Sequence, residues 1–118
     1  MKILILEDNL ERMKAFTKKL IGHDYDYTAN AQEAIEYLKQ NTYDIIYLDH
    51  DLGGKQMEWD EDNCGMNVAE FISEHPLPET TKVVIHSFNV AAAQRMLRTI
   101  PGSIYIPGVW LQKGVNDG

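Results

Sequence analysis

The stretch Tyr47-Leu48-Asp49-His50-Asp51-Leu52-Gly53 carries the strongest structural signal in this chain. It closes an apolar run that begins at Ile45, and it places two carboxylates and an imidazole where that run breaks before Gly53-Gly54. A short apolar run that ends in polar residues and glycine is typical of a buried strand followed by a loop. Ligands of open α/β sheets bind beyond such strand ends. The stretch therefore predicts a buried parallel strand with a functional site at its carboxyl end.

Two other apolar runs also end in polar, titratable residues. Glu7-Asp8 follow the run from Ile3 to Leu6, and His86-Ser87 follow the run from Val83 to Ile85. Because the carboxyl ends of parallel strands lie along one edge of a sheet, these groups should converge with Asp49. Clustered carboxylates repel one another unless a cation joins them. The sequence therefore predicts one composite site for a divalent metal and a phosphoryl group.

Strand and helix signals alternate along the chain. Expected strands cover residues 2–6, 24–29, 44–49, 82–87 and 103–106, and the more polar 24–29 is expected near an edge. Helices are expected at about 10–22, 30–41, 65–75 and 89–100. The first and fourth follow the apolar stripes Leu10, Met13, Phe16, Leu20, Ile21 and Val90, Ala93, Met96, Leu97, Ile100. This order predicts right-handed parallel crossovers and a doubly wound α/β sheet.

Two segments depart from that regular pattern. The connection 53–65 is long for a strand-to-helix loop. It could be a solvated, mobile connection, or a lid in which Trp59 contacts the ligand. After Ile106 too few residues remain for a full closing helix, so the last helix is expected to be truncated. Trp110 and Leu111 would then cover the sheet in its place.

Composition narrows the class of protein. With 118 residues, 44 % of them hydrophobic, the chain should form a single domain over 1–118. A net charge of −7 disfavours binding to a nucleic-acid duplex. The lone Cys64 excludes an internal disulfide, no apolar run is long enough to span a membrane, and no export signal is present. We therefore expect a cytoplasmic protein.

The run from Ile3 to Asn9, together with Asp49 and Ser87, resembles the receiver domain, the phospho-acceptor module of two-component response regulators. The resemblance covers residues 1 to about 107. It implies a receiver-like, flavodoxin-like sheet of five parallel strands flanked by helices. It also implies that Glu7, Asp8 and Asp49 hold Mg²⁺ or Mn²⁺ together with the backbone carbonyl of Asp51, and that Ser87 donates to a phosphoryl oxygen.

Several features differ from ordinary receivers. Ile106 stands where the family has a lysine, and His50 and His86 are additions to the usual site. The combination resembles the divergent group of cyclic-phosphate-processing receiver domains. It implies a metal-dependent phosphoesterase that acts on or binds a small cyclic phosphate. Asp49 or a water would attack phosphorus, and the two histidines would divide the general-base and general-acid roles.

Simpler interpretations stay open for most of these residues. Glu7-Asp8 could serve simply as a cap of the first helix, without binding a metal. Asp51 could equally well shape the turn before Gly53 or support the metal ligands. Asn89 is predicted to cap the fourth helix rather than to contact a ligand. His50 and His86 could be structural residues held by hydrogen bonds. Two alternative functions also remain. One is a single-domain response regulator that receives phosphate on Asp49 from a histidine kinase, and the other is a non-catalytic interaction module.

Overall fold

The computed structural model describes residues 2–50, 64–87 and 89–107. In these ranges strands and helices alternate as the sequence predicts. Their bounds are β1 (Lys2–Leu6), α1 (Leu10–Lys19), β2 (Asp24–Thr28), α2 (Ala31–Gln40), β3 (Ile45–Leu48), α3 (Gly65–Glu74), β4 (Lys82–Ser87), α4 (Val90–Thr99) and β5 (Ile104–Pro107). No helix in the described ranges combines the length and the apolar character needed to cross a membrane.

The strands form one parallel sheet in the order β2-β1-β3-β4-β5. The polar strand β2 therefore lies at an edge, as predicted, and β3 lies at the centre. The strand order reverses between β1 and β3, and ligands of open α/β sheets bind at such a switch point. Backbone hydrogen bonds continue past the ends of these two strands: Glu7 donates to the Thr28 carbonyl and Asp49 to the Leu6 carbonyl, at 3.0 and 3.1 Å. The sheet itself thus fixes both acidic residues at the switch point.

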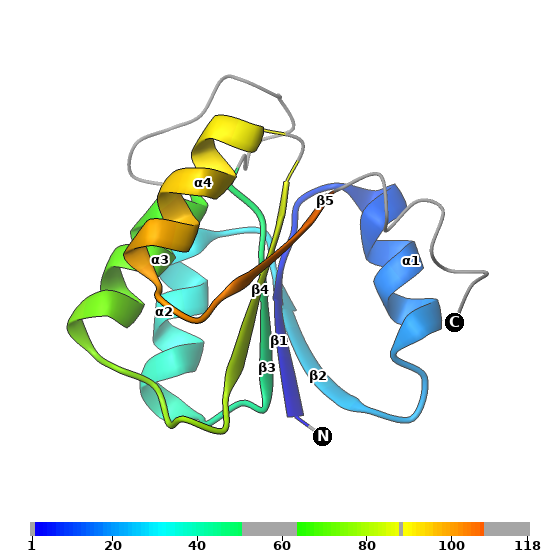
Figure 1. The fold of residues 1–118 in the computed structure, drawn as a ribbon. Coiled ribbons are helices and arrows are strands. Elements are labelled where there is room, and N and C mark those ends of the chain that lie inside the picture. Colours follow the sequence, from blue (N-terminus) through cyan, green and yellow to red (C-terminus); the bar gives the residue numbers. More distant parts are fainter. Residues whose placement is uncertain (1, 51–63, 88, 108–118) are drawn as a thin grey trace.

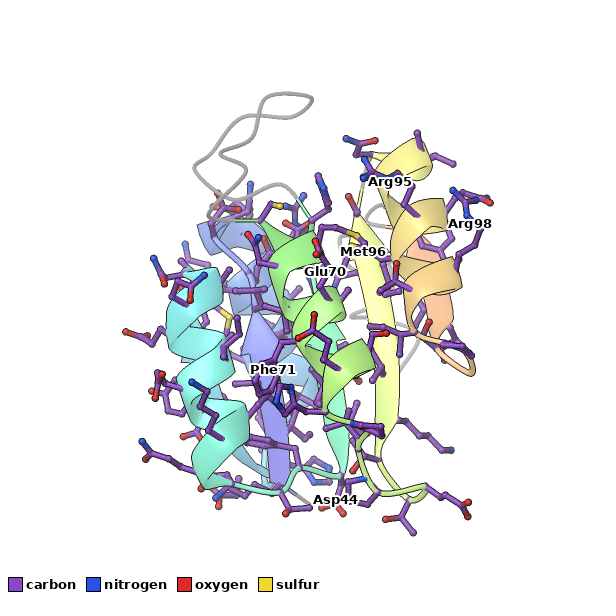
Figure 2. All side chains as sticks on the ribbon, turned by 90° about the vertical axis from the view of Figure 1, so that its left-hand side faces the viewer. Asp44, Glu70, Phe71, Arg95, Met96 and Arg98 are labelled. Carbon is purple, nitrogen blue, oxygen red and sulfur yellow. The ribbon has the colours of Figure 1, made fainter. Side chains whose placement is uncertain are left out.

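Helices cover the two faces of the sheet unequally. Among the described helices, α2, α3 and α4 lie on one face and α1 lies on the other (Figure 1). The larger apolar cluster includes Leu4, Leu48, Val68 and Met96, whereas a smaller one gathers around Phe16 under α1. Figure 2 looks onto the three-helix face. On α4, Met96 is fully buried, while Arg95 and Arg98 on the same helix are exposed.

Two residues of the predicted apolar stripes are exposed, so this part of the prediction is wrong. Ile21 is 80 % exposed because α1 ends at Lys19 and Ile21 belongs to the turn before Gly22, whose φ is +89°. Val90 is 55 % exposed because it is the first residue of α4, which begins beyond the carboxyl end of β4 (Figure 1). At both positions the helical periodicity continues past the segment that the sheet covers.

Gly65 brings α3 into direct contact with the end of β3. Its N–H donates to the His50 carbonyl at 2.9 Å. A Cβ atom at this position would overlap the carbonyl oxygen of Asp49 and approach the His50 Cα atom to 2.9 Å. Glycine is required here because the backbone of α3 packs directly on the backbone that follows β3. The lid predicted for 53–65 lies, apart from residues 64 and 65, outside the described residues, as do Asp51, Trp59, Trp110 and Leu111.

Candidate functional site at the carboxyl edge of the sheet

Glu7 follows β1 and is completely buried. Its Oε1 accepts hydrogen bonds from Arg12 Nε at 2.8 Å and from His86 Nε2 at 2.9 Å. Its Oε2 accepts from Arg12 Nη2 and from the backbone N–H of Asn9, both at 3.0 Å. A carboxylate offers about four lone-pair sites. The acceptor capacity of Glu7 is therefore filled by these donors.

These donors keep Glu7 ionised despite its burial. Burial alone raises the pKa of this carboxyl group. The hydrogen bonds from His86 and Arg12, and the positive charge of Arg12, outweigh the burial and lower the pKa to about 2. Glu7 is consequently a fixed negative charge at the end of β1 over the whole physiological range.

Asp49 follows β3 and is only 1 % exposed. Its Oδ1 accepts from the backbone N–H of His50 at 2.8 Å, and its Oδ2 accepts from Arg12 Nη2 at 3.0 Å. Burial raises the pKa of Asp49, the negative charges of Glu7 and Asp8 raise it further, and Arg12 offsets only part of this, so the pKa is about 8. Burial and the neighbouring negative charges therefore favour the protonated form of Asp49, even though Arg12 lies beside it.

Arg12 joins the two carboxylates and was not among the site residues predicted from the sequence. It lies in the first turn of α1, where its backbone N–H donates to the Asn9 side chain at 3.0 Å. Its guanidinium forms a two-point contact with Glu7, reaches Asp49 as well, and leaves the side chain only 9 % exposed. A signal existed, because Arg12 lies one helical turn before the buried Phe16. A charged residue on a buried helix face requires a partner of opposite charge.

His86 is the second partner of Glu7 and lies in β4 with its ring edge against Phe16, 5.1 Å between centroids. Glu7 is ionised and can only accept, so the contact places the ring hydrogen on His86 Nε2. The other nitrogen, Nδ1, is buried without a hydrogen-bond partner among the described residues. His86 thus acts in this structure as a fixed donor that orients Glu7.

The remaining predicted residues have the following positions. Ser87 is buried, and its Oγ accepts from the backbone N–H of Asn89 at 3.0 Å. The Asn89 side chain accepts from Ala92 N–H at 3.1 Å, which confirms the predicted helix cap. His50 is buried beside Asp49. Its backbone N–H donates to Asp49 Oδ1, and its carbonyl accepts from the Gly65 N–H. Their predicted contacts with a ligand stay predictions.

The geometry brings together a possible metal-binding group. One ligand atom each from Glu7, Asp49 and His86 lies within 4.8 Å of the others. The predicted ligand set was Glu7, Asp8 and Asp49, so among the described residues His86 takes the place of Asp8 in this group. Asp8 is half-buried and acts on Asp49 through its charge. His86 is a poor ligand through Nε2, since its hydrogen would have to move to Nδ1, where no described residue accepts it. The two carboxylates, Glu7 and Asp49, fit a hard cation such as Mg²⁺ or Mn²⁺.

A parallel sheet in the order 2-1-3-4-5, with a buried aspartate after β3 and an acidic pair after β1, defines a receiver domain. More specifically, residues 2–101 match the cyclic-phosphate processing receiver domain, and the chain belongs to that family.

Solved response-regulator structures share the fold at low sequence identity. The receiver domain of the Francisella response regulator 1452 superimposes with a TM-score of 0.67 at 20 % identity, covering 98 % of this chain and 93 % of that one. A LuxR-family DNA-binding response regulator from Staphylococcus aureus gives 0.71 at 16 % identity, with coverages of 98 % and 92 %. TrrA from Thermotoga maritima, solved in complex with Mg²⁺-BeF, gives 0.68 at 18 %, with coverages of 98 % and 96 %.

A curated relative is similar in sequence over a shorter region. Hybrid signal transduction histidine kinase B of Dictyostelium discoideum is 42 % identical over 50 residues. The aligned region covers 41 % of this chain and only 2 % of the kinase.

Proposed function

We propose that this domain binds a small cyclic phosphate at the carboxyl edge of β1, β3 and β4 and hydrolyses one of its ester bonds with the help of Mg²⁺ or Mn²⁺. The observation that carries the proposal is the convergence of Glu7, Asp49 and His86, which are buried at the carboxyl edge of the sheet with one ligand atom each within 4.8 Å of the others. Burial and the negative charge of Glu7 also raise the pKa of Asp49 to about 8. A divalent cation held by Glu7 and Asp49 would neutralise the phosphoryl oxygens.

The side chains of this site supply the other elements of the reaction. Hydrolysis adds a water oxygen to phosphorus, breaks one ring P–O bond and delivers a proton to the leaving oxygen. His86 carries a proton at Nε2 beside Glu7, and His50 adjoins Asp49, so the two histidines divide the acid and base roles. Ser87 donates its hydroxyl hydrogen to a phosphoryl oxygen. The family's description and the Mg²⁺-BeF bound to TrrA support this chemistry.

The test is a panel of 2′,3′-cyclic and 3′,5′-cyclic nucleotides incubated with the protein and millimolar Mg²⁺ or Mn²⁺. We expect metal-dependent conversion of one class to the monoester, followed by ³¹P NMR, and its loss in Asp49→Asn. Lys14→Gln is the control, because Lys14 is exposed on α1 and pairs only loosely with Glu11, at 3.7 Å. If no member of the panel is bound or converted with either metal, the proposal is overturned.

A second function is favoured by the similarity to a hybrid histidine kinase and by the position of Asp49 after β3. In this case Asp49 accepts a phosphoryl group from a histidine kinase. Incubation with acetyl phosphate and Mg²⁺ separates the two, because only a phospho-acceptor gains the mass of one phosphoryl group. If both assays are negative, the non-catalytic interaction module remains.

A further inference from the structure

Arg12 occupies the space between Glu7 and Asp49 that a metal ion would have to share. Its Nε and Nη2 atoms both bond Glu7, and the same Nη2 lies 3.0 Å from Asp49 Oδ2. Arg12 and Glu7 therefore form a neutral pair inside the site. The second carboxyl group, Asp49, receives only the Nη2 hydrogen bond, from an atom that also bonds Glu7. The guanidinium thus donates two hydrogen bonds to Glu7 and one to Asp49.

The hydrogen bonds of Glu7 identify which donor can leave. Both of its oxygens already accept two hydrogen bonds, so a metal can reach Glu7 only if a donor withdraws. The Asn9 donor is a backbone N–H at the cap of α1, and the His86 ring is held in β4 against Phe16. Arg12 is attached by a flexible stem of three methylene groups, so it can move without disturbing the backbone.

We propose that Arg12 is a resident counter-ion that exchanges with the incoming divalent cation. When the cation binds Glu7 and Asp49, the guanidinium withdraws from Glu7 and pairs with the phosphoryl oxygens of the ligand. It starts 3.0 Å from Asp49, beside the position that the phosphoryl group takes in the proposed function, on which this inference rests. The planar fork of arginine, which here binds a carboxylate at two points, matches phosphate equally well.

Metal affinity tests the exchange directly and needs no substrate. We would measure Mn²⁺ binding by electron paramagnetic resonance for the parent, Arg12→Gln, Arg12→Lys and the control Lys14→Gln. Removing a competing positive charge from the site should tighten Mn²⁺ binding by about tenfold or more in Arg12→Gln. Arg12→Lys, which keeps the charge but loses the fork, should lie between, and the exposed control should match the parent. The lysine variant also guards against a glutamine variant that fails to fold.

The arginine itself provides a second readout. The Arg12 Nε–H is buried and bonded to Glu7, so its ¹H–¹⁵N signal should be resolved and absent from Arg12→Lys. Addition of Mg²⁺ should shift this signal strongly. Inorganic phosphate, titrated by calorimetry at saturating Mg²⁺, should bind the parent at least about tenfold more tightly than Arg12→Gln.

The possible failures are distinguishable. If neither the parent nor Arg12→Gln binds Mn²⁺, the metal site of the proposed function is wrong and the exchange falls with it. If the parent binds Mn²⁺ but Arg12→Gln binds it equally or more weakly, only the exchange is overturned. A metal-saturated parent whose Arg12 Nε–H signal is unchanged overturns it as well.

Discussion

Asp49→Asn should change how the stability of this protein depends on pH. The folded state holds the pKa of Asp49 at about 8, through burial and the charge of Glu7, against an ordinary 3.8. Between these values folding takes up one proton, because the unfolded chain has an ionised aspartate and the folded one does not. The contribution of Asp49 is therefore fully present below about pH 4 and is lost as the pH rises toward 8. Asparagine resembles the protonated acid in shape and does not titrate.

The magnitude follows from one proton and not from the exact pKa. One bound proton corresponds to about 1.4 kcal/mol of unfolding free energy per pH unit. From about pH 5.5 to 7.5 the parent should thus lose about 3 kcal/mol relative to Asp49→Asn. Glu7 has the opposite shift, from 4.5 to about 2, so its contribution is present above about pH 4.5 and lost only at lower pH. It does not interfere in this window.

Urea unfolding followed by far-UV circular dichroism, in EDTA and at several pH values, measures the difference. Subtracting the Asp49→Asn curve removes the contribution of the titrating groups that do not interact with Asp49. Lys14→Gln should run parallel to the parent, since it changes an exposed charge on the same helix that carries Arg12. Parallel curves for the parent and Asp49→Asn would contradict this prediction. They would show that Asp49 ionises normally and that Arg12 compensates both carboxylates.

Three other changes have defined outcomes. Millimolar Mg²⁺ or Mn²⁺ should raise the melting temperature of the parent at pH 8, and the rise should be lost in Asp49→Asn; a melting temperature that ignores the metal contradicts a metal site. In a cyclic-nucleotide assay, His50→Ala and His86→Gln should each lower turnover roughly a hundredfold, and parental activity should give a bell-shaped pH profile; a variant with full activity removes that histidine from the mechanism. Gly65→Ala should cost about 2 kcal/mol or more in urea unfolding, because the added methyl group overlaps the Asp49 carbonyl, and an unchanged midpoint would show that α3 can shift freely.

The fold and the convergence of strand ends were predictable because both follow from local signals. A buried strand such as β3 reads as a short apolar run, and the polar residue that ends it marks the sheet edge. Glu7, Asp49 and His86 were therefore brought together correctly from positions up to 79 residues apart. The exposure of Ile21 was not predictable in the same way, because helical periodicity does not record where the helix ends.

Arg12 was missed for a related reason. A charged residue near a helix start is normally solvated, and although the spacing to Phe16 places Arg12 on the buried face of α1, it does not identify the partners of its charge. Its partners lie 5 residues before it, in Glu7, and 37 residues after it, in Asp49. Only the three-dimensional arrangement makes Arg12 the charge between them. Clustered carboxylates require positive charge, and this chain supplies part of it through its own Arg12.

The position of that cation also changes how the site should be interpreted. The resemblance to receivers leads one to look for a positive charge on β5, where this chain has Ile106. Ile106 is the register partner of His86 in the neighbouring strand β4, and it packs against the apolar cluster under α1. This side of the site is therefore apolar. The positive charge enters instead from α1, beside Glu7. Arg12 contacts both acidic residues, so in the proposed function a cation that binds Glu7 and Asp49 would alter its position, and metal binding and phosphate binding would be linked through this single side chain.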